Sequence, residues 1–196
     1  MRAVYYHTYG DAEVLQIGEL DKPACGEGQV LVEVAAAGIN PIDRRPRAGE
    51  LQAYIQRTFP VTPGFDLSGR IVEVGDVVTG WQVGDEIMGL AFTWSIQHGT
   101  YAEFTPVDVG AIAPKPVNAS FVQAAGIPLV SSTAWQSLLE FGQLGPGKTV
   151  LIQAGAGGVG SVAIPVAKHL DATENTTASA ANSDFVRSLG ADVVID

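Results

Sequence analysis

Cysteine and histidine are scarce in this chain of 196 residues, which has one cysteine, Cys25, and three widely spaced histidines. A catalytic zinc ion needs three protein ligands and a structural zinc ion usually four, drawn largely from these two residue types. We therefore expect no metal site. A single cysteine also excludes an internal disulfide and is compatible with a reducing compartment, so the expected localisation is cytoplasmic.

Basic residues and long apolar runs are scarce as well. The chain has 11 lysines and arginines against 21 acidic residues, a formal net charge of -10, and its one local basic cluster is Arg44, Arg45 and Arg47. Nucleic acids and anionic membranes are bound by clustered basic side chains, so neither is an expected partner. No apolar stretch approaches the roughly 20 residues of a membrane span, and the N-terminal segment lacks the apolar core of a signal peptide.

The first part of the chain has the pattern of a β-rich domain. In QVLVEVA, Val30, Val32 and Val34 share one face of a strand and Leu31 and Glu33 share the other, which predicts that one face is buried. Many short strands with regular turns predict a barrel or a sandwich. The β-type runs, up to about residue 116, are RAVYYH, EVLQIGEL, QVLVEVAAAG, LSGRIVEVG, DEIMGL and TYAEFTPV.

The second part has the pattern of an α/β fold, so the predicted fold class is mixed β and α/β. From Ser120 to Phe141 the apolar period is helical, and it indicates two helices broken near Gly126 and Pro128, with Ser120 as an N-cap. TVLIQA then has the continuous apolar character of a buried parallel strand. We expect the boundary between the two parts at residues 115 to 130.

A glycine-rich stretch, QAGAGGVG, follows that strand and precedes a helical pattern. Gly155, Gly157 and Gly160 satisfy GxGxxG, whose glycines permit a tight turn, close approach of a dinucleotide pyrophosphate, and close packing of helix on strand. Gly158 and Val159 complete the predicted cofactor-binding loop, because N–H groups at a helix start face the anion. The alternative is a glycine turn that binds no ligand.

The segment that should recognise the adenosine ribose lies about 20 residues beyond the glycines. It reads TTASAANSDFVRS and has Ser179 where NAD-binding proteins carry an acidic residue, with Arg187 further on. Without a carboxylate the site tolerates a 2'-phosphate, so we predict NADP as the cofactor and Ser179 and Arg187 as cofactor-binding residues. The alternative is that Ser179 or Ser183 caps the following helix.

With these residues in view, the chain resembles a zinc-free quinone oxidoreductase of the medium-chain dehydrogenase/reductase superfamily. This resemblance implies a GroES-like β-barrel substrate domain over residues 1–120, connecting helices over 121–148, and the first half of a Rossmann-type NADP-binding sheet over 149–196. The family's sheet continues beyond this length, so we expect a C-terminal truncation. The matching blocks are AAAGINPID, PGFDLSGRIVEVG, VGDEIMG, GTYAEF, IPLVSSTAWQSL, VLIQAGAGGVG and LGADVVID.

The resemblance also implies a reaction. It indicates hydride transfer from NADPH to a small-molecule quinone or a similar electron-poor carbonyl or enone, in a homo-oligomer, expected to be a dimer. Zinc-dependent relatives have a cysteine in place of Asn40 and a histidine in place of Phe65, which agrees with the expected absence of a metal. Arg44 and Arg45 stand where relatives often have an aromatic residue or a lysine, so the substrate preference stays open.

The resemblance implies that three residues of this chain lie at the site where NADPH and the substrate bind. Asn40 and Asp43 match the family's Asn-Pro-x-Asp segment and are the predicted catalytic residues, while Thr133 is expected near the nicotinamide. Each has a structural alternative. Asn40, Pro41 and Asp43 form a good helix start by themselves, and Thr133 can bond its own helix backbone.

Three residues after the glycines depart from the expected pattern. Pro165 lies inside the predicted helix and should kink it. Asp171 replaces the expected terminal glycine and suits neither a left-handed cap nor the negative end of the helix dipole. Glu174 lies in the next strand, which we therefore predict to be displaced, exposed or disordered. The second function hypothesis is accordingly a degenerate, non-catalytic binding module with weak or no cofactor affinity.

Overall fold

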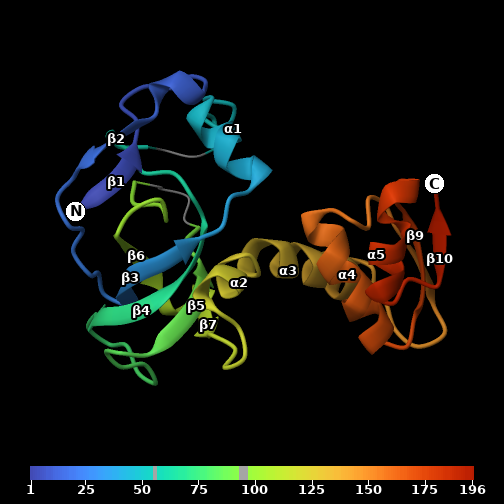
Figure 1. Cartoon of the computed structure of the whole chain (residues 1–196). Helices are drawn as coiled ribbons and strands as arrows, with labels where there is room; N and C mark the ends of the chain where they lie inside the picture. The colour runs from blue at the N-terminus through green and yellow to red at the C-terminus, as the bar shows by residue number, and fades with distance from the viewer. Residues whose placement is uncertain (55–56, 93–96) are drawn as a thin grey trace. The chain divides into compact units, whose positions relative to one another are not determined.

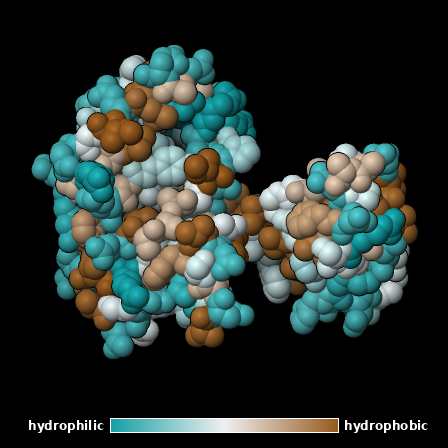
Figure 2. All heavy atoms as spheres, viewed as in Figure 1, coloured by the Kyte–Doolittle hydropathy of each residue, from teal (hydrophilic) through white to brown (hydrophobic). Residues whose placement is uncertain are grey.

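The computed structural model describes residues 1–54, 57–92 and 97–196, and the chain divides into two compact units, Met1–Pro128 and Leu129–Asp196. The predicted fold class is confirmed, because an antiparallel β unit is followed by a parallel three-stranded sheet with helices. On the face visible in Figure 2, apolar and polar side chains are interspersed over each unit. No helix in the described part of the chain is long and apolar enough to cross a membrane.

The first unit contains a five-stranded antiparallel sheet in the order β6-β3-β4-β5-β7 and a two-stranded sheet, β1-β2 (Figure 1). Bulges interrupt the pairing of β3 with β4 between Leu31 and Val32 and between Val34 and Ala36, and bulges of this kind bend a sheet. The strands are β1 (Arg2–Tyr5), β2 (Gln16–Glu19), β3 (Gln29–Ala37), β4 (Asp66–Val74), β5 (Glu86–Leu90), β6 (Phe104–Asp108) and β7 (Ile112–Pro114).

The core of this unit lies on one face of the sheet, as the alternation in β3 predicts. Val30 and Val32 are fully buried and Glu33 is exposed. One detail of the prediction is wrong, because Leu31 is also fully buried. The second face is therefore covered at that position too. The buried cluster consists of Val30, Val32, Leu67, Ile71, Ile87, Ala91 and Val107.

Short helices follow the sheet, and the expected break between them is confirmed. α2 (Phe121–Ala125) ends at Gly126 and α3 begins at Pro128. Ser120 is the N-cap of α2, and its hydroxyl accepts the backbone N–H of Gln123 at 3.3 Å. α2 contacts β3, β4 and β5. The other helical segments are α1 (Arg44–Arg47), α3 (Pro128–Trp135), a π-helical segment (Gln136–Phe141) and the 3₁₀ turns η1 (Ala12–Val14), η2 (Pro41–Asp43), η3 (Val109–Ala111) and η5 (Ala180–Asn182).

The second unit is the predicted Rossmann-type half-sheet, with three parallel strands in the order β10-β9-β8. Apolar residues of α4, β8 and α5 form its core, and Ile164, Ala167 and Val186 are fully buried. Its elements are β8 (Thr149–Ile152), α4 (Gly158–His169), β9 (Thr173–Thr177), α5 (Ser183–Ser188) and β10 (Val193–Ile195).

The prediction that the Glu174 strand is displaced, exposed or disordered is wrong. β9 is paired on both sides, and Glu174 lies opposite Val150 with none of its surface exposed. Among the described residues, neither carboxylate oxygen has a hydrogen-bond partner. Burial, with the nearby Asp192 carboxylate, raises the pKa of Glu174 to about 7. A buried carboxyl is tolerated because it can stay protonated instead of carrying a bare charge.

The helix end at Asp171 also corrects the sequence-based expectation. Asp171 adopts the left-handed conformation, with φ of 55°. Its N–H bonds the Lys168 carbonyl at 3.1 Å and the Ala172 N–H bonds the Ala167 carbonyl at 3.2 Å, which is a Schellman cap. α4 continues through Pro165, whose side chain is exposed. The expected kink at that residue stays a prediction.

Candidate functional site

A cavity of about 250 Å³ in the first unit brings the two predicted catalytic residues together. It lies where the segment after β3 meets the loops before β4 and β6. Its lining is part apolar and part polar, which suits a small organic ligand that is held by a few polar groups. The lining residues are Leu15, Ile39, Asn40, Asp43, Arg44, Arg47, Pro63 and Tyr101.

Asn40 and Asp43 form one hydrogen-bonded unit at the start of the turn Pro41–Asp43. The Asn40 backbone N–H donates to Asp43 Oδ2 at 2.7 Å, and the Asn40 amide Nδ2 donates to Asp66 Oδ2 at 2.8 Å. Asp66 is 1% exposed, so the amide is fixed against a buried carboxylate. The helix-start interpretation and the site interpretation are therefore compatible, because the residues that these bonds hold in place also line the cavity.

Tyr101 is the site residue that the sequence reasoning missed. Its hydroxyl donates to Asp43 Oδ2 at 2.6 Å, while Asp43 Oδ1 is buried and has no hydrogen-bond partner in the described part of the chain. Gly64 makes room for this arrangement: its φ is 97°, and a Cβ there would lie 2.6 Å from the Tyr101 ring. The only sequence signal was the position of Tyr101 in the block GTYAEF.

The electrostatics of this network favour neutral groups. Burial raises the pKa of Asp43, and the hydrogen bonds from Tyr101 and Asn40 partly oppose that change. Burial also raises the pKa of Tyr101, as does its bond to the Asp43 carboxylate, so the phenol keeps its proton. A carboxyl whose pKa is raised keeps its proton to a higher pH than a free carboxyl does, which favours service as a general acid.

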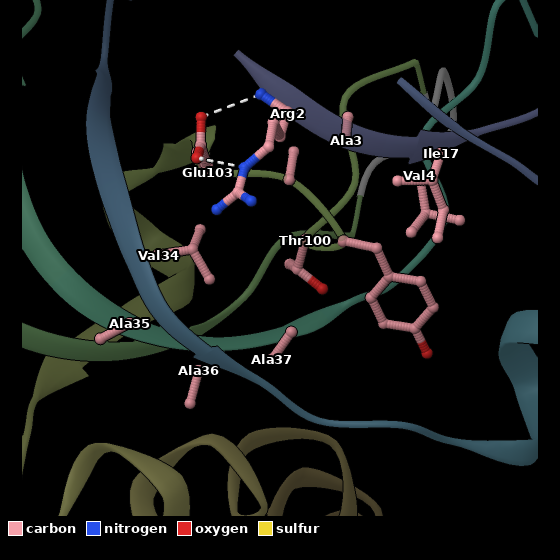
Figure 3. Close-up of a pocket in the computed structure, with 12 residues that line it drawn as sticks. Arg2, Ala3, Val4, Ile17, Val34, Ala35, Ala36, Ala37, Thr100 and Glu103 are labelled. Carbon is pink, nitrogen blue, oxygen red and sulfur yellow. Dashed lines mark hydrogen bonds and ion pairs between the residues drawn. The ribbon is translucent and has the colours of Figure 1, made fainter. Parts of the chain in front are cut away.

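A second cavity in the same unit, of about 370 Å³, lies beside the first and shares Tyr101 with it. Figure 3 shows its small apolar lining, including Val34 and Ala37, with the Arg2–Glu103 ion pair at its edge at 3.1 Å. The Thr100 hydroxyl, buried at its wall, has no hydrogen-bond partner within residues 1–54, 57–92 and 97–196. The lining offers few groups for chemistry, so the first cavity is the stronger candidate site.

The glycine loop of the second unit has the geometry that the motif predicts. A Cβ on Gly160 would lie 2.5 Å from the Ala154 carbonyl oxygen, and a Cβ on Gly155 would collide with the Thr176 hydroxyl. These two glycines therefore let the loop and α4 pack closely against the sheet. The Ala154 N–H bonds Thr177 Oγ1 at 2.9 Å, which ties the loop to the end of β9.

The remaining loop residues face solvent. Gly157, Gly158 and Val159 are exposed, and the atoms nearest to a Cβ on either glycine would be 3.2 Å or 3.3 Å away. The first bond of α4 runs from the Ser161 N–H to the Gly157 carbonyl at 2.9 Å. The N–H groups of the first turn therefore have no acceptor within the helix, and such groups can receive a phosphate.

The other predicted cofactor residues lie on the surface of the same unit. Ser179 follows β9 and Arg187 lies on α5, and both are exposed. The Ser179 hydroxyl makes no cap hydrogen bond and instead accepts the Asn182 amide at 3.2 Å. Thr133 bonds the Leu129 carbonyl at 2.8 Å, which is the structural alternative foreseen for it.

Comparison with known proteins supports both units. Residues 26–117 match the family model "Alcohol dehydrogenase GroES-like domain". The NADPH-dependent alkenal/one oxidoreductase, chloroplastic, of Arabidopsis thaliana is 39% identical over 100% of this chain and 52% of its own length. The solved quinone oxidoreductase from Coxiella burnetii has a TM-score of 0.87 and 36% identity, over 100% of this chain and 62% of that one. The chain belongs to the medium-chain dehydrogenase/reductase superfamily.

Within the superfamily, a mycobacterial structure complexed with NADPH also matches, with a TM-score of 0.85 and 31% identity over 100% of this chain and 58% of that one. The chain thus spans between about half and three fifths of the length of these relatives.

Two superfamily positions associated with zinc can be located in the first unit. Asn40 holds Asp66 as described, and Phe65 is buried, with its ring 5.5 Å from that of Phe92. Among residues 1–54, 57–92 and 97–196, no three His, Cys, Asp or Glu side chains are grouped so that they could hold a metal ion.

Proposed function

We propose that this chain provides the substrate cavity and the pyrophosphate loop of a zinc-free, NADPH-dependent oxidoreductase. The acceptor is a quinone or a similar electron-poor carbonyl or enone. The observation that carries the proposal is the convergence of Asn40, Asp43 and Tyr101 on one cavity in the unit that matches the GroES-like family model. The names of the alkenal/one and quinone oxidoreductase relatives support the same reaction.

The three side chains can assist such a reaction without a metal. Nδ2 of Asn40 has one N–H on Asp66 and a second for a substrate carbonyl oxygen. Donors of this kind stabilise the oxyanion that develops when a carbonyl or enone is reduced. Asp43, whose pKa burial raises, can supply the proton that completes the reduction. Tyr101 positions the Asp43 carboxyl.

The exposed start of α4 supports the proposal that the second unit binds NADPH. NADPH, when bound, supplies the hydride. The N–H groups of Gly158 and Val159 would hold its pyrophosphate, because these residues are exposed in the first turn of α4, while Gly157, whose N–H donates to the Ala154 carbonyl, would let the pyrophosphate approach closely. Ser179 and Arg187 would bind the 2'-phosphate, and Thr133 would lie near the nicotinamide.

A fluorescence titration with NADPH tests this assignment. We expect micromolar binding by the full chain, and a loss of at least about 10-fold in Gly157→Val, because the new side chain blocks the approach of the pyrophosphate. Gly145→Val is the matched control, since a Cβ at Gly145 would meet open space. Equal weakening in both variants would show that the effect comes from the fold and not from the loop.

The second candidate is a degenerate, non-catalytic binding module. The buried, unpartnered carboxyl of Glu174 favours it, because β9 supports the loop that the cofactor would contact. If NADPH fails to bind at millimolar concentration while the chain is folded, this candidate replaces the first. Reduction of 1,4-benzoquinone with consumption of NADPH would exclude it.

Two further properties belong to the proposal. The single cysteine is compatible with a cytoplasmic protein, although the Arabidopsis relative is named chloroplastic. We also propose a homodimer, which light scattering on the full chain tests directly.

A further inference from the structure

Two arginines on the wall of the candidate cavity are unused by the proposed reaction. Helix α1 has the sequence RRPR, and its first and last residues, Arg44 and Arg47, line the cavity. The chain has only 11 basic residues and a net charge of -10, so a local cluster of three arginines is unusual for it. Arg45, between them in sequence, does not line the cavity.

The acidic partners near α1 do not neutralise this cluster. Glu50 pairs with Arg44 at 2.6 Å and with Arg45 at 3.1 Å. Arg47 is half-buried, and its Nε donates to the Gly10 carbonyl at 3.3 Å. In the described part of the chain, no carboxylate forms an ion pair with Arg47. Among the described residues, the hydrogen bond given for the Arg47 side chain uses Nε, so the charge of this guanidinium is not matched by a carboxylate there.

The cavity wall contains the two arginines and, as a separate hydrogen-bonded group, the proposed catalytic residues. Asp43 Oδ2 accepts from the Tyr101 hydroxyl and the Asn40 N–H, and among the described residues its carboxyl forms no ion pair with Arg44 or Arg47. A small substrate could present its carbonyl to one part and a negative group to the other, within a volume of about 250 Å³.

We propose that Arg47, assisted by Arg44, binds a carboxylate on the substrate, so that the cavity prefers an enone or carbonyl compound that is also a carboxylic acid. This inference rests on the proposed oxidoreductase function. Guanidinium groups suit carboxylates because they donate two parallel hydrogen bonds to the two oxygens. Leu15, Ile39 and Pro63 would contact the apolar carbons between the two polar ends.

The test compares an acid with its neutral ester. The full chain is assayed with NADPH and either 4-oxo-2-pentenoate or its methyl ester, and the ratio of their kcat/KM values is measured. We expect Arg47→Gln to lower this acid-to-ester ratio by about 10-fold or more, since a charge-assisted hydrogen bond is lost. Arg47→Lys should keep most of the ratio. Arg45→Gln is the matched control on the same helix and should leave it unchanged.

Direct binding separates failure of this inference from failure of the proposed function. NMR titration with 4-oxopentanoate and its methyl ester needs no turnover. Tighter binding of the acid, weakened by about 10-fold in Arg47→Gln, supports the inference even if no acceptor is reduced. If neither the enone pair nor 1,4-benzoquinone is reduced, the proposed function fails. Equal binding of acid and ester, or an equal loss in Arg45→Gln, would overturn the role of Arg47.

Discussion

Asp43 in the first unit and Glu174 in the second are both buried carboxyl groups, but their surroundings differ. In the first unit, Asp43 Oδ2 accepts hydrogen bonds from the Tyr101 hydroxyl and the Asn40 N–H, at 2.6 Å and 2.7 Å. In the second unit, Glu174 is fully buried, and neither of its oxygens has a hydrogen-bond partner in the part of the chain that the structure describes. Burial raises the pKa of both groups, but only the first has donors that oppose the change.

Asp43, which has hydrogen-bond donors beside a cavity, can serve a site. Glu174, which has none among the described residues, only lowers the stability of the fold. Asp43 borders a cavity, and its Oδ2 is held there by donors from Tyr101 and Asn40. Glu174 lies within the sheet, and the hydrogen bonds around it use backbone groups: its N–H donates to Asp192 Oδ2 at 2.8 Å. We infer that ionisation of Glu174 lowers the stability of the second unit as the pH rises above neutral.

The largest expected effect is that of Glu174→Leu. Because the pKa of Glu174 is about 7 in the folded chain against 4.5 for the free side chain, the folded state holds the proton more tightly. The contribution of Glu174 to the stability of the folded state is therefore fully present below pH 4.5, and it is lost as the pH rises through about 7. The loss is on the order of 3 kcal/mol. The apolar variant should recover about that amount at pH 8.

Urea unfolding at pH 5 and pH 8, followed by amide exchange in β9 and α4, measures this gain. Glu33→Leu is the matched control, because Glu33 is an exposed acid on a strand of the other unit. A gain that is equal at the two pH values would show that the apolar side chain stabilises by packing alone. No gain at pH 8 would mean that the Glu174 carboxyl has a partner in solution.

Tyr101→Phe should have the next largest effect on folding stability. It removes one of the donors to Asp43, so that this carboxyl, like that of Glu174, is buried with less hydrogen bonding. Removing the hydroxyl takes away a donor that lowers the pKa of Asp43, so that pKa should rise further. A hydrogen bond to a charged group contributes about 2 kcal/mol. We expect a loss of that size at pH 8 and a smaller loss at pH 5, where more of the carboxyl is protonated.

The same urea experiment checks Tyr101→Phe against Tyr54→Phe, because Tyr54 is 74% exposed. Equal losses for Tyr101→Phe at both pH values would contradict an ionisable partner. They would indicate that the phenol contributes by packing alone.

The features that the sequence could predict are local ones. The Ser120 cap, the break at Pro128 and the glycine loop each depend on residues within a few positions of one another, where steric and hydrogen-bonding rules act directly. The contact between Tyr101 and Asp43 joins residues 58 positions apart, and no periodicity encodes it. The burial of Glu174 depends on two neighbouring strands and α4, so a polar residue there wrongly suggested an exposed strand.

Ser120→Ala tests how much a helix cap that the sequence predicts contributes to the stability of the first unit. The hydroxyl accepts the Gln123 N–H at the start of α2, and the loss of an N-cap costs about 1 kcal/mol. Thermal unfolding of the first unit should detect this loss. Ser120→Asp is the control, since aspartate also caps and should keep most of the stability. An equal loss in both variants would mean that the hydroxyl acts through its bond to Gln123 Oε1 instead.

The smallest expected effect is a gain in the second unit, from Asp171→Gly. Asp171 has φ of 55°, a conformation that glycine adopts without strain, and its carboxylate lies at the negative end of α4. The greater freedom of glycine in the unfolded chain offsets part of the gain, which leaves about 0.5 kcal/mol. Asp171→Asn removes the charge while keeping a side chain that tolerates this conformation. If asparagine gives the whole gain, the charge and not the backbone is the cause, and if glycine destabilises α4, the Schellman cap depends on the aspartate itself.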